Sequence, residues 1–490
     1  MLDKFKVLFA SSEVAPLAQT GGLAEVAGSL PQAITALGYP TTVIMPAYRQ
    51  TLANFSFKKL YDGLKVPFGS LDLPFSILEG QARENQRVLL IKYDPFFDRE
   101  GLYGPAGEAY PDNPARFAFF SKAIIETLKQ IPETFDLVVA NDWQTGLLMP
   151  LLNQFGPKAP AGLFIIHNQG FLGLAPAETA ELIGLPESYY ALEGMEYYGQ
   201  LSYLKAGIVY SQAVVTVSPT YAREIQSPEF GNGLDGVLRL HSNKLSGIVN
   251  GVDYLSWNPE TDLFISHNYS RDDFAGKAQC KISVKEQLKL PPSHRPLFSM
   301  VSRLTAQKGI SLVIEAGAEL FKLGLDLIIL GTGEPWFEEQ LRALMAAHPD
   351  NMRLILAYDN KLAHQIIAGS DFTLVPSIYE PCGLIQLYSL RYGTIPIVRA
   401  VGGLNDTVRD FAGANPEGLW DNGFKFSQFQ PPALTRAVRR ATELYRSPDF
   451  KTMALANMAE DHSWSNSAKE YLKIFRKLLA QPPAPTGAGA

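Results

Sequence analysis

Residues 376–408 read PSIYEPCGLIQLYSLRYGTIPIVRAVGGLNDTV. With the apolar residues 372–375 before it, this stretch predicts a buried strand, an exit loop, a helix over 384–390, a second strand over 394–398 and a second loop. Glycines and polar side chains thus follow two successive strands of one βα unit, at the edge where open parallel sheets bind ligands. The second loop, GGL at 402–404, also opens a helix, whose free N–H groups favour an anion such as phosphate.

Length, charge and cysteine content bound the class of protein. A chain of 490 residues is too long for one typical core, so two or more domains are expected. A net charge of −6 offers no basic field for nucleic acid or a membrane surface, and an anionic ligand would need a local cluster of cations. The two cysteines, Cys280 and Cys382, favour a reducing compartment over a disulfide scaffold. No signal peptide or membrane-spanning run is recognisable, so we expect a cytoplasmic enzyme or binding protein.

Strands that end in polar residues alternate with helical patterns, which predicts α/β domains with parallel sheets. Further strands are predicted over 6–10, 137–140, 163–166, 213–217, 245–249, 298–301, 327–330 and 353–357. Helices are predicted from Leu23 onwards and over 113–129, 199–206 and 465–479. The alternation lapses after Trp257, which predicts a domain boundary there. The expected parts are a first domain at 1–257, a second at 258–460, a final helix at 461–480 and a disordered tail at 481–490.

Two similar loops stand nearly four hundred residues apart. GGLAE at 21–25 and GGLND at 402–406 suggest two βα halves that face one ligand across a cleft. Other predicted strands of the first half run into Asp142, His167 and Asn250. A lone histidine at a strand end is more often structural than catalytic, but His167 shares its predicted edge with the other two residues.

The second half offers a site for a diphosphate. Arg303 and Lys308 lie in one strand-to-helix loop, and two cations beside a helix N-terminus bind diphosphate without metal. Such a pair alone is usually a solvated basic loop, yet Glu380 and the 402–404 glycines follow neighbouring strands. Glu380 offers acceptors for sugar hydroxyls, and Tyr358 offers a ring for a base. The absence of an Asp-x-Asp pair, a Cys or His cluster and a P-loop argues against metal-dependent phosphate chemistry.

The motifs of the whole chain, from about residue 7 to 471, carry a specific resemblance. They are QTGGLAEVAGSLP (19–31), FDREGLYG (97–104), NDWQTGLL (141–148), IHNQGFLG (166–173), YYGQLSYLKAGI (197–208), VSPTYAREIQSPEFGNGLDGVL (217–238), LSGIVNGVDYLSWNP (245–259), VSRLTAQKG (301–309), EPCGLIQLYSLRYGTIPIVRAVGGLNDTV (380–408) and SWSNSAKEYL (463–472). In these the chain resembles bacterial glycogen synthases and plant starch synthases, which form glycosyltransferase family 5.

The resemblance implies a GT-B fold, with two Rossmann-like parallel-sheet domains, a cleft between them and a last helix that returns to the first domain. It implies transfer of glucose from ADP-glucose to the non-reducing end of an α-1,4-glucan such as glycogen or a maltooligosaccharide. In this family configuration is retained, by front-face attack, and neither a metal nor a cofactor takes part. The sequence leaves ADP-glucose against UDP-glucose open, because base choice depends on few contacts.

The family's site residues map onto this chain position by position. Arg303 and Lys308 match its diphosphate-binding pair, Glu380 the acid beside the donor glucose, His167 a residue near that glucose, and Asp142 an acid of the catalytic cleft. These five are the candidate catalytic residues. The candidate donor-binding residues are Gln19, Gly21, Gly22, Asn250, Ser302, Tyr358, Cys382, Gly383, Leu384, Gly402, Gly403, Leu404 and Thr407.

Three positions depart from the family pattern. Gln19 replaces a lysine that reaches the donor phosphates, Glu25 replaces an aspartate, and Leu172 replaces a glutamine near the acceptor. Gln19 supports an alternative interpretation, a weakly active paralogue that binds glucan or nucleotide sugar as a scaffold. A second alternative is a nucleotide-sugar transferase that acts on a non-glucan acceptor, which the YGQLSYLKAGI and PEFGNGLDGVL stretches disfavour.

Overall fold

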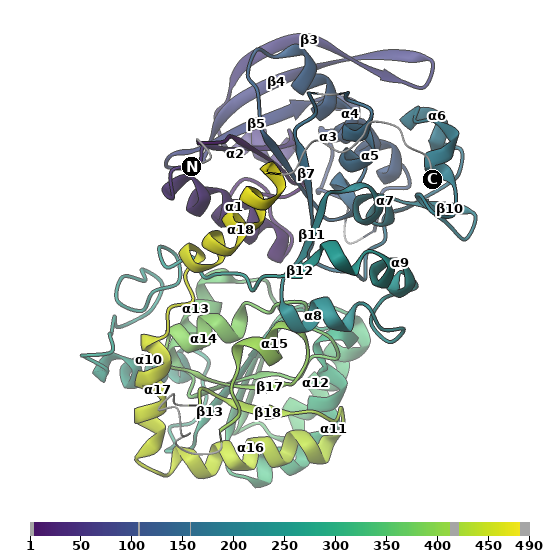
Figure 1. Ribbon diagram of the computed structural model, residues 1–490. Helices are drawn as coiled ribbons and strands as arrows, with labels where there is room; N and C mark the ends of the chain where they lie inside the picture. Colours follow the sequence, from purple (N-terminus) through teal and green to yellow (C-terminus); the bar gives the residue numbers. More distant parts are fainter. Residues whose placement is uncertain (1–3, 106–107, 157, 412–420, 481–490) are drawn as a thin grey trace. The chain divides into compact units, whose positions relative to one another are not determined.

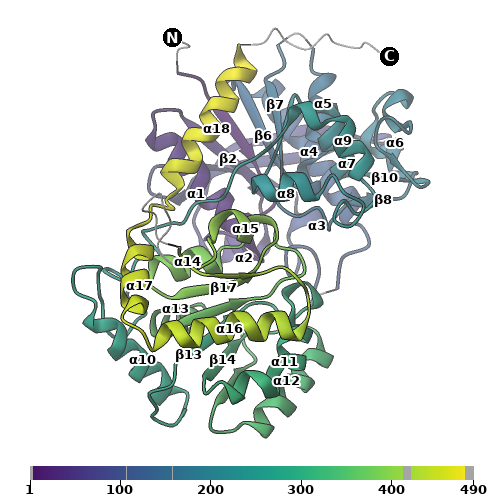
Figure 2. The same cartoon turned by 60° about the horizontal axis from the view of Figure 1, so that its bottom comes forward.

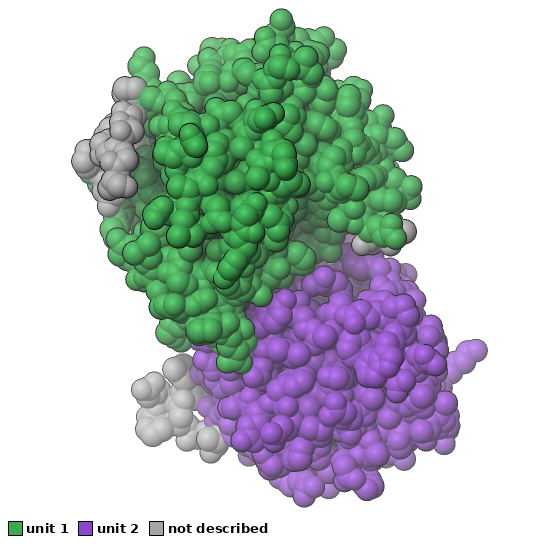
Figure 3. All heavy atoms as spheres, turned by 90° about the vertical axis from the view of Figure 1, so that its right-hand side faces the viewer, with its two compact units in different colours: residues 1–217, 222–250, 464–490 green, residues 218–221, 251–463 purple. Residues whose placement is uncertain are grey.

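The structure is a computed structural model that describes residues 4–105, 108–156, 158–411 and 421–480. The chain forms two compact units, which Figure 3 colours separately. Unit 1 consists of residues 1–217, 222–250 and 464–490, and unit 2 of residues 218–221 and 251–463. The predicted tail at 481–490 lies outside the described residues.

Unit 1 is built on a sheet with the strand order β12-β11-β7-β6-β1-β2-β5-β4-β3. Its strands are β1 (Val7–Ala10), β2 (Thr41–Pro46), β3 (Lys58–Phe68), β4 (Leu71–Arg83), β5 (Gln86–Lys92), β6 (Leu137–Asn141), β7 (Ala161–Ile166), β11 (Ala213–Thr216) and β12 (Leu245–Gly247). The pairings from β12 to β5 are parallel, whereas β4 runs antiparallel to β3 and β5. Strands β1, β2 and β6 are buried along their whole length, and most of their residues are apolar, as is typical of parallel strands covered on both faces.

The helices of unit 1 cover this sheet (Figure 1). They are α1 (Gly22–Ala36), α2 (Arg49–Asn54), α3 (Asp94–Phe97), α4 (Asn113–Gln130), α5 (Leu148–Asn153), α6 (Thr179–Ile183), α7 (Tyr203–Tyr210), α9 (Asp235–Leu240) and α18 (Trp464–Leu479). Helix α8 (Pro219–Glu224) begins in unit 2 and ends in unit 1. Helix α18 lies beside α1. Its Phe475 also packs edge-on against Phe5, which precedes β1, with ring centroids 6.1 Å apart.

The helix predicted over 199–206 is wrong in its first half. A small sheet of β8 (Leu174–Ala175), β10 (Gln200–Ser202) and β9 (Glu196–Tyr197) takes residues 200–202, and α7 starts only at Tyr203. The cause is a tight turn at Tyr198 and Gly199, which both have positive φ values, 47° and 80°. Two such residues form the type I′ turn that joins antiparallel strands.

Unit 2 contains a parallel sheet with the order β15-β14-β13-β16-β17-β18. Its strands are β13 (Leu297–Val301), β14 (Asp326–Leu330), β15 (Met352–Ile355), β16 (Phe372–Val375), β17 (Ile395–Arg399) and β18 (Phe424–Phe426). Its helices are α10 (Ala275–Gln287), α11 (Ile310–Lys322), α12 (Pro335–Ala347), α13 (Asn360–Gly369), α14 (Ile385–Arg391), α15 (Gly402–Thr407), α16 (Pro431–Tyr445) and α17 (Asp449–Ala459).

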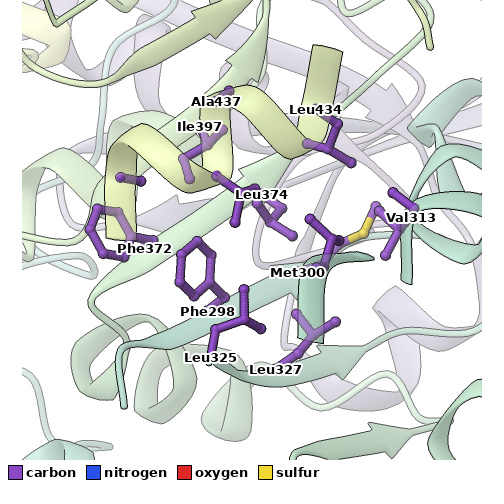
Figure 4. Packing of buried hydrophobic residues seen from close by; sticks show 14 of the residues in the cluster. Phe298, Met300, Val313, Leu325, Leu327, Phe372, Leu374, Ile397, Leu434 and Ala437 are labelled. Atoms are coloured by element: carbon purple, nitrogen blue, oxygen red, sulfur yellow. The ribbon is translucent and has the colours of Figure 1, made fainter. Parts of the chain in front are cut away.

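The main core of unit 2 lies between the sheet and helices α11 and α16 (Figures 2 and 4). Figure 4 shows Leu434 and Ala437 of α16 beside Ile397 and Leu374 of the sheet, and all four side chains are buried. Covered strands of this kind need apolar residues at successive positions, which is why the sequence pattern located β13 to β17; it did not predict β18.

The predicted boundary after Trp257 differs from the division of the chain into units, which falls at Asn250 and Gly251. The Trp257 ring stacks on His364 and on Tyr388, with centroids 3.6 Å and 3.9 Å away. Residues 251–257 therefore pack with unit 2, although their sequence continues the pattern of the first half.

Candidate active site

Three neighbouring strands of unit 2 bring Arg303, Lys308, Glu380 and the glycines at 402–403 to one edge of the sheet. Strand β16 lies between β13 and β17, all parallel, so the loops that follow these strands leave the same side of the sheet. The strand order reverses between β13 and β16, and such a switch point is where open α/β sheets bind ligands. The loop at 302–309 follows β13, the loop at 376–384 follows β16 and the glycines at 402–403 follow β17.

Lys308 and Glu380 form an ion pair at this edge. The Lys308 ammonium donates to Glu380 Oε2 at 2.6 Å, and the side chains are only 19% and 8% exposed. The Ser377 hydroxyl donates to the same oxygen at 2.9 Å. Glu380 therefore has one oxygen engaged within unit 2, and its other oxygen is left to accept from a hydroxyl of a ligand.

The glycines at 402–403 lie against the backbone of the 376–384 loop. Gly402 has a φ of 45°, and a Cβ added there would lie 1.9 Å from the Glu380 carbonyl oxygen; at Gly403 it would lie 2.2 Å from that of Cys382. The Gly403 N–H donates to the carbonyls of Glu380 and Pro381, both at 3.1 Å. The expectation that this N–H is free for phosphate is thus wrong at Gly403, and the glycines serve close approach instead.

The remaining predicted residues of unit 2 differ in their surroundings. Arg303 is exposed, and its guanidinium pairs with no carboxylate in the part of the chain that the structure describes. Tyr358, after β15, is 81% exposed. Thr407 is buried; its hydroxyl donates to the Gly403 carbonyl at 2.7 Å and accepts from Gln386 at 3.2 Å. The other members are the half-buried Ser302, the buried Cys382 and Leu404, and Gly383 and Leu384 just before α14.

Unit 1 presents a comparable edge. Its strand order reverses between β1 and β6, and Asp142 directly follows β6. The Asp142 backbone has φ 54° and ψ −176°, a conformation that costs about 1–3 kcal/mol and persists where the surrounding structure enforces it. Its carboxylate accepts the N–H groups of His167, at 2.7 Å, and Asn168, at 3.3 Å. These bonds join the ends of β6 and β7.

His167 is held as a neutral ring. Its Nε2 lies 2.8 Å from Asn141 Oδ1, and the Asn141 amide nitrogen donates to the Ala10 carbonyl at 2.9 Å. Asn141 Oδ1 is therefore the acceptor, and Nε2 carries the proton while Nδ1 keeps its lone pair for a ligand. Burial lowers the pKa of His167 to about 3, so the ring stays uncharged at neutral pH.

Burial raises the pKa of Asp142 to about 7, against the two backbone hydrogen bonds, which lower it. The unfolded carboxyl loses its proton near pH 4, so between about pH 4 and 7 the folded state retains a proton that the unfolded state releases, and stability falls as pH rises. We expect Asp142→Asn to remove this dependence. The unfolding free energy of the wild type, relative to the variant, should fall by about 1.4 kcal/mol per pH unit between pH 5 and 7, measured by urea unfolding. Parallel pH curves for the two proteins would contradict it.

The loop that carries Gln19, Gly21 and Gly22 follows β1 and opens α1. The Gln19 amide donates to Glu25 Oε1 at 2.8 Å, and both glycines are exposed. Asn250, which follows β12, is buried, and its Oδ1 has no hydrogen-bond partner among the described residues. A buried amide oxygen in this state is one that a ligand hydroxyl or a water satisfies.

Sequence reasoning missed three residues of these edges. They are Glu13, which binds the 19–22 loop, Asn141, which orients His167, and Ser377, which bonds Glu380. Each stands at the end of a strand or one to three residues beyond it, and this position was the signal available in the sequence.

Within the described ranges, no three His, Cys, Asp or Glu side chains are grouped to hold a metal ion. No helix of that part of the chain is both long and apolar enough to cross a membrane.

Comparison with known proteins extends over nearly the whole chain. Residues 6–240 match the starch synthase catalytic domain family, and residues 284–453 match the glycosyl transferases group 1 family. The catalytic domain of starch synthase IV from Arabidopsis thaliana, bound to ADP and acarbose, superposes with a TM-score of 0.90 at 31% identity; the match covers 98% of this chain and 100% of that one. A sucrose-phosphate synthase from Thermosynechococcus elongatus, at 16% identity and a TM-score of 0.60, shares the fold alone. The fold is therefore that of an α/β glycosyltransferase of the GT-B type.

The curated relatives narrow the class further. A glycogen synthase of Syntrophotalea carbinolica is 42% identical over 481 residues, which cover 96% of this chain and 99% of that protein. A glycogen synthase of Myxococcus xanthus is 43% identical over 484 residues, which cover 97% and 100%. The chain belongs to the glycogen synthase and starch synthase family, as its motifs predicted.

Proposed function

We propose that this chain is a retaining glucosyltransferase that moves glucose from ADP-glucose to the non-reducing end of an α-1,4-glucan, without a metal. Membership of the family supports the reaction, and the similar starch synthase IV domain was solved with ADP and acarbose. The observation that carries the proposal is the convergence of Lys308, Glu380 and the 402–403 glycines at one switch point.

In the proposed reaction, Arg303 and Lys308 stabilise the negative charge that develops on the departing diphosphate. Glu380 and the neutral ring of His167 accept hydrogen bonds from hydroxyls of the donor glucose, and the Tyr358 ring stacks on the base. Asp142 supplies an acid whose raised pKa, about 7, leaves both of its protonation states accessible at neutral pH. Asn250, with its unsatisfied buried oxygen, binds a further hydroxyl of the donor.

Incorporation of labelled glucose into glycogen and maltooligosaccharides tests the proposal. The protein is given ADP-glucose and UDP-glucose in parallel, each with and without EDTA. Elongation with ADP-glucose, unchanged by EDTA, is the expected result, and NMR of the product should show α-1,4 linkages. Glucan binding without elongation from either donor would overturn the proposal in favour of a scaffold.

Gln19 is the one position that favours the scaffold interpretation, and it can be tested separately. We expect Gln19→Lys to lower the KM for ADP-glucose several-fold, because a cation is added to the donor site. Glu25 would compete for the new ammonium, since its carboxylate already binds the Gln19 side chain. The double variant Gln19→Lys/Glu25→Gln should therefore lower the KM further than Gln19→Lys alone. Unchanged donor KM values in steady-state kinetics of both variants would show that position 19 does not contact the donor.

A further inference from the structure

A buried carboxylate holds the first glycine loop of unit 1. Glu13 lies three residues beyond β1 and is 4% exposed. Its Oε2 accepts the Thr20 N–H at 2.5 Å and the Gly21 N–H at 3.3 Å, and its Oε1 accepts the Thr20 hydroxyl at 2.6 Å and the Tyr103 hydroxyl at 2.7 Å. Four donors thus converge on one side chain.

The Glu13 carboxylate accepts from backbone N–H groups to which a bound anion could otherwise bind. Backbone N–H groups just before a helix are groups that a phosphate binds in other proteins. Here an internal carboxylate occupies the N–H groups of Thr20 and Gly21, immediately before α1. Glu13 forms no ion pair within the described residues, and its four hydrogen bonds compensate the loss of water around its carboxylate. The loop is consequently held in one conformation without a ligand.

Glu13 also lies at the switch point of the unit 1 sheet. It follows β1 and Asp142 follows β6, the two strands between which the order reverses. The charge of Glu13 raises the pKa of Asp142, in addition to the larger effect of burial. The other titratable groups that face Glu13 are Tyr103 and Tyr48, whose pKa values burial raises, and the buried Arg116 lies beside Tyr48.

We propose that Glu13 is a positioning residue for donor binding, which sets the conformation of the Gln19–Gly22 loop through its hydrogen bonds to Thr20 and Gly21. This inference rests on the proposed function, in which that loop contacts the donor. A loop that is already ordered loses less conformational entropy when the donor binds. Loss of this order therefore raises the donor KM more than it lowers kcat.

Two conservative variants distinguish the effect of the side-chain length at position 13 from the effect of its charge. Glu13→Gln keeps the length of the side chain, and its carbonyl can still accept from the two N–H groups while the rotatable hydroxyls of Thr20 and Tyr103 accept from its amide. Glu13→Asp keeps the charge but is one methylene shorter and cannot hold both N–H groups. Tyr103→Phe is the matched control, because it removes one donor to the carboxylate and leaves the loop backbone bonded.

The test combines donor kinetics with amide hydrogen exchange of a peptide that covers Thr20 and Gly21. Glu13→Asp should raise the KM for ADP-glucose about tenfold, the cost of weakening charge-assisted hydrogen bonds, and should speed exchange at both amides. Glu13→Gln should keep the KM within about threefold and retain protection, and it should lower the pKa of Asp142, read from the pH dependence of stability. Tyr103→Phe should resemble the wild type in both measurements.

A wild-type KM and wild-type amide exchange in Glu13→Asp would overturn the proposal. A larger rise of the donor KM in Glu13→Gln than in Glu13→Asp would also overturn it, because the charge of Glu13 would then be the essential property. The exchange measurement needs no activity. If the wild type transfers no glucose from ADP-glucose, the proposed function fails, while rapid exchange in Glu13→Asp alone would still establish that Glu13 orders the loop.

Discussion

Arg303→Ala should lower kcat/KM with ADP-glucose by about 10²–10³-fold, the effect of deleting one preorganised donor to a developing anion. The side chain is exposed and pairs with no carboxylate in the described part of the chain, so nothing in the fold depends on it. The unfolding free energy should stay within about 0.5 kcal/mol of the wild type.

Arg303→Lys is the matched control, because it retains the charge but not the planar, two-pronged hydrogen bonding of a guanidinium. We expect an intermediate kcat/KM for this variant. Steady-state kinetics and urea unfolding of the three proteins test the assignment together. Full activity in Arg303→Ala would remove this residue from the diphosphate site.

Lys308→Ala should lower turnover as strongly and should also destabilise unit 2. It leaves the carboxylate of Glu380, 8% exposed, without its cation. Leaving a buried charged group short of a partner costs about 1–3 kcal/mol, so the unfolding free energy should fall by that amount, whereas in Arg303→Ala it should not.

The double variant Lys308→Ala/Glu380→Gln distinguishes the two effects. A neutral amide at position 380 can still accept from the Ser377 hydroxyl and no longer needs a cation, so stability should largely return. Activity should stay low, because the diphosphate still lacks one cation and the donor glucose lacks the Glu380 carboxylate. Recovery of activity with stability would mean that Lys308 serves the fold and not the reaction.

Much of the fold followed from local pattern. The strand predicted over 372–375 is β16 (Phe372–Val375), and most other predicted strands of both sheets end within one or two residues of the observed ends. Fully covered parallel strands must be apolar at successive positions, which makes them conspicuous. The helix predicted over 199–206 is wrong in its first half, because the turn at Tyr198 and Gly199 joins the antiparallel strands β9 and β10. Helical periodicity in the sequence does not reveal this strand pairing.

By itself the sequence determined which residues stand at strand ends, because burial and turn chemistry depend on a few neighbouring positions. It therefore also determined which loops carry the five candidate catalytic residues, which are Arg303, Lys308, Glu380, Asp142 and His167. Only the tertiary structure decided how those side chains are paired. The Lys308–Glu380 ion pair and the Gly403 N–H turned toward the Glu380 carbonyl join residues that the order of β13, β16 and β17 brings together, and the hydroxyl of Tyr103 reaches Glu13 from 90 residues away in the sequence. Pairing of this kind depends on which strands become neighbours, and that is set by long-range packing that no local pattern encodes.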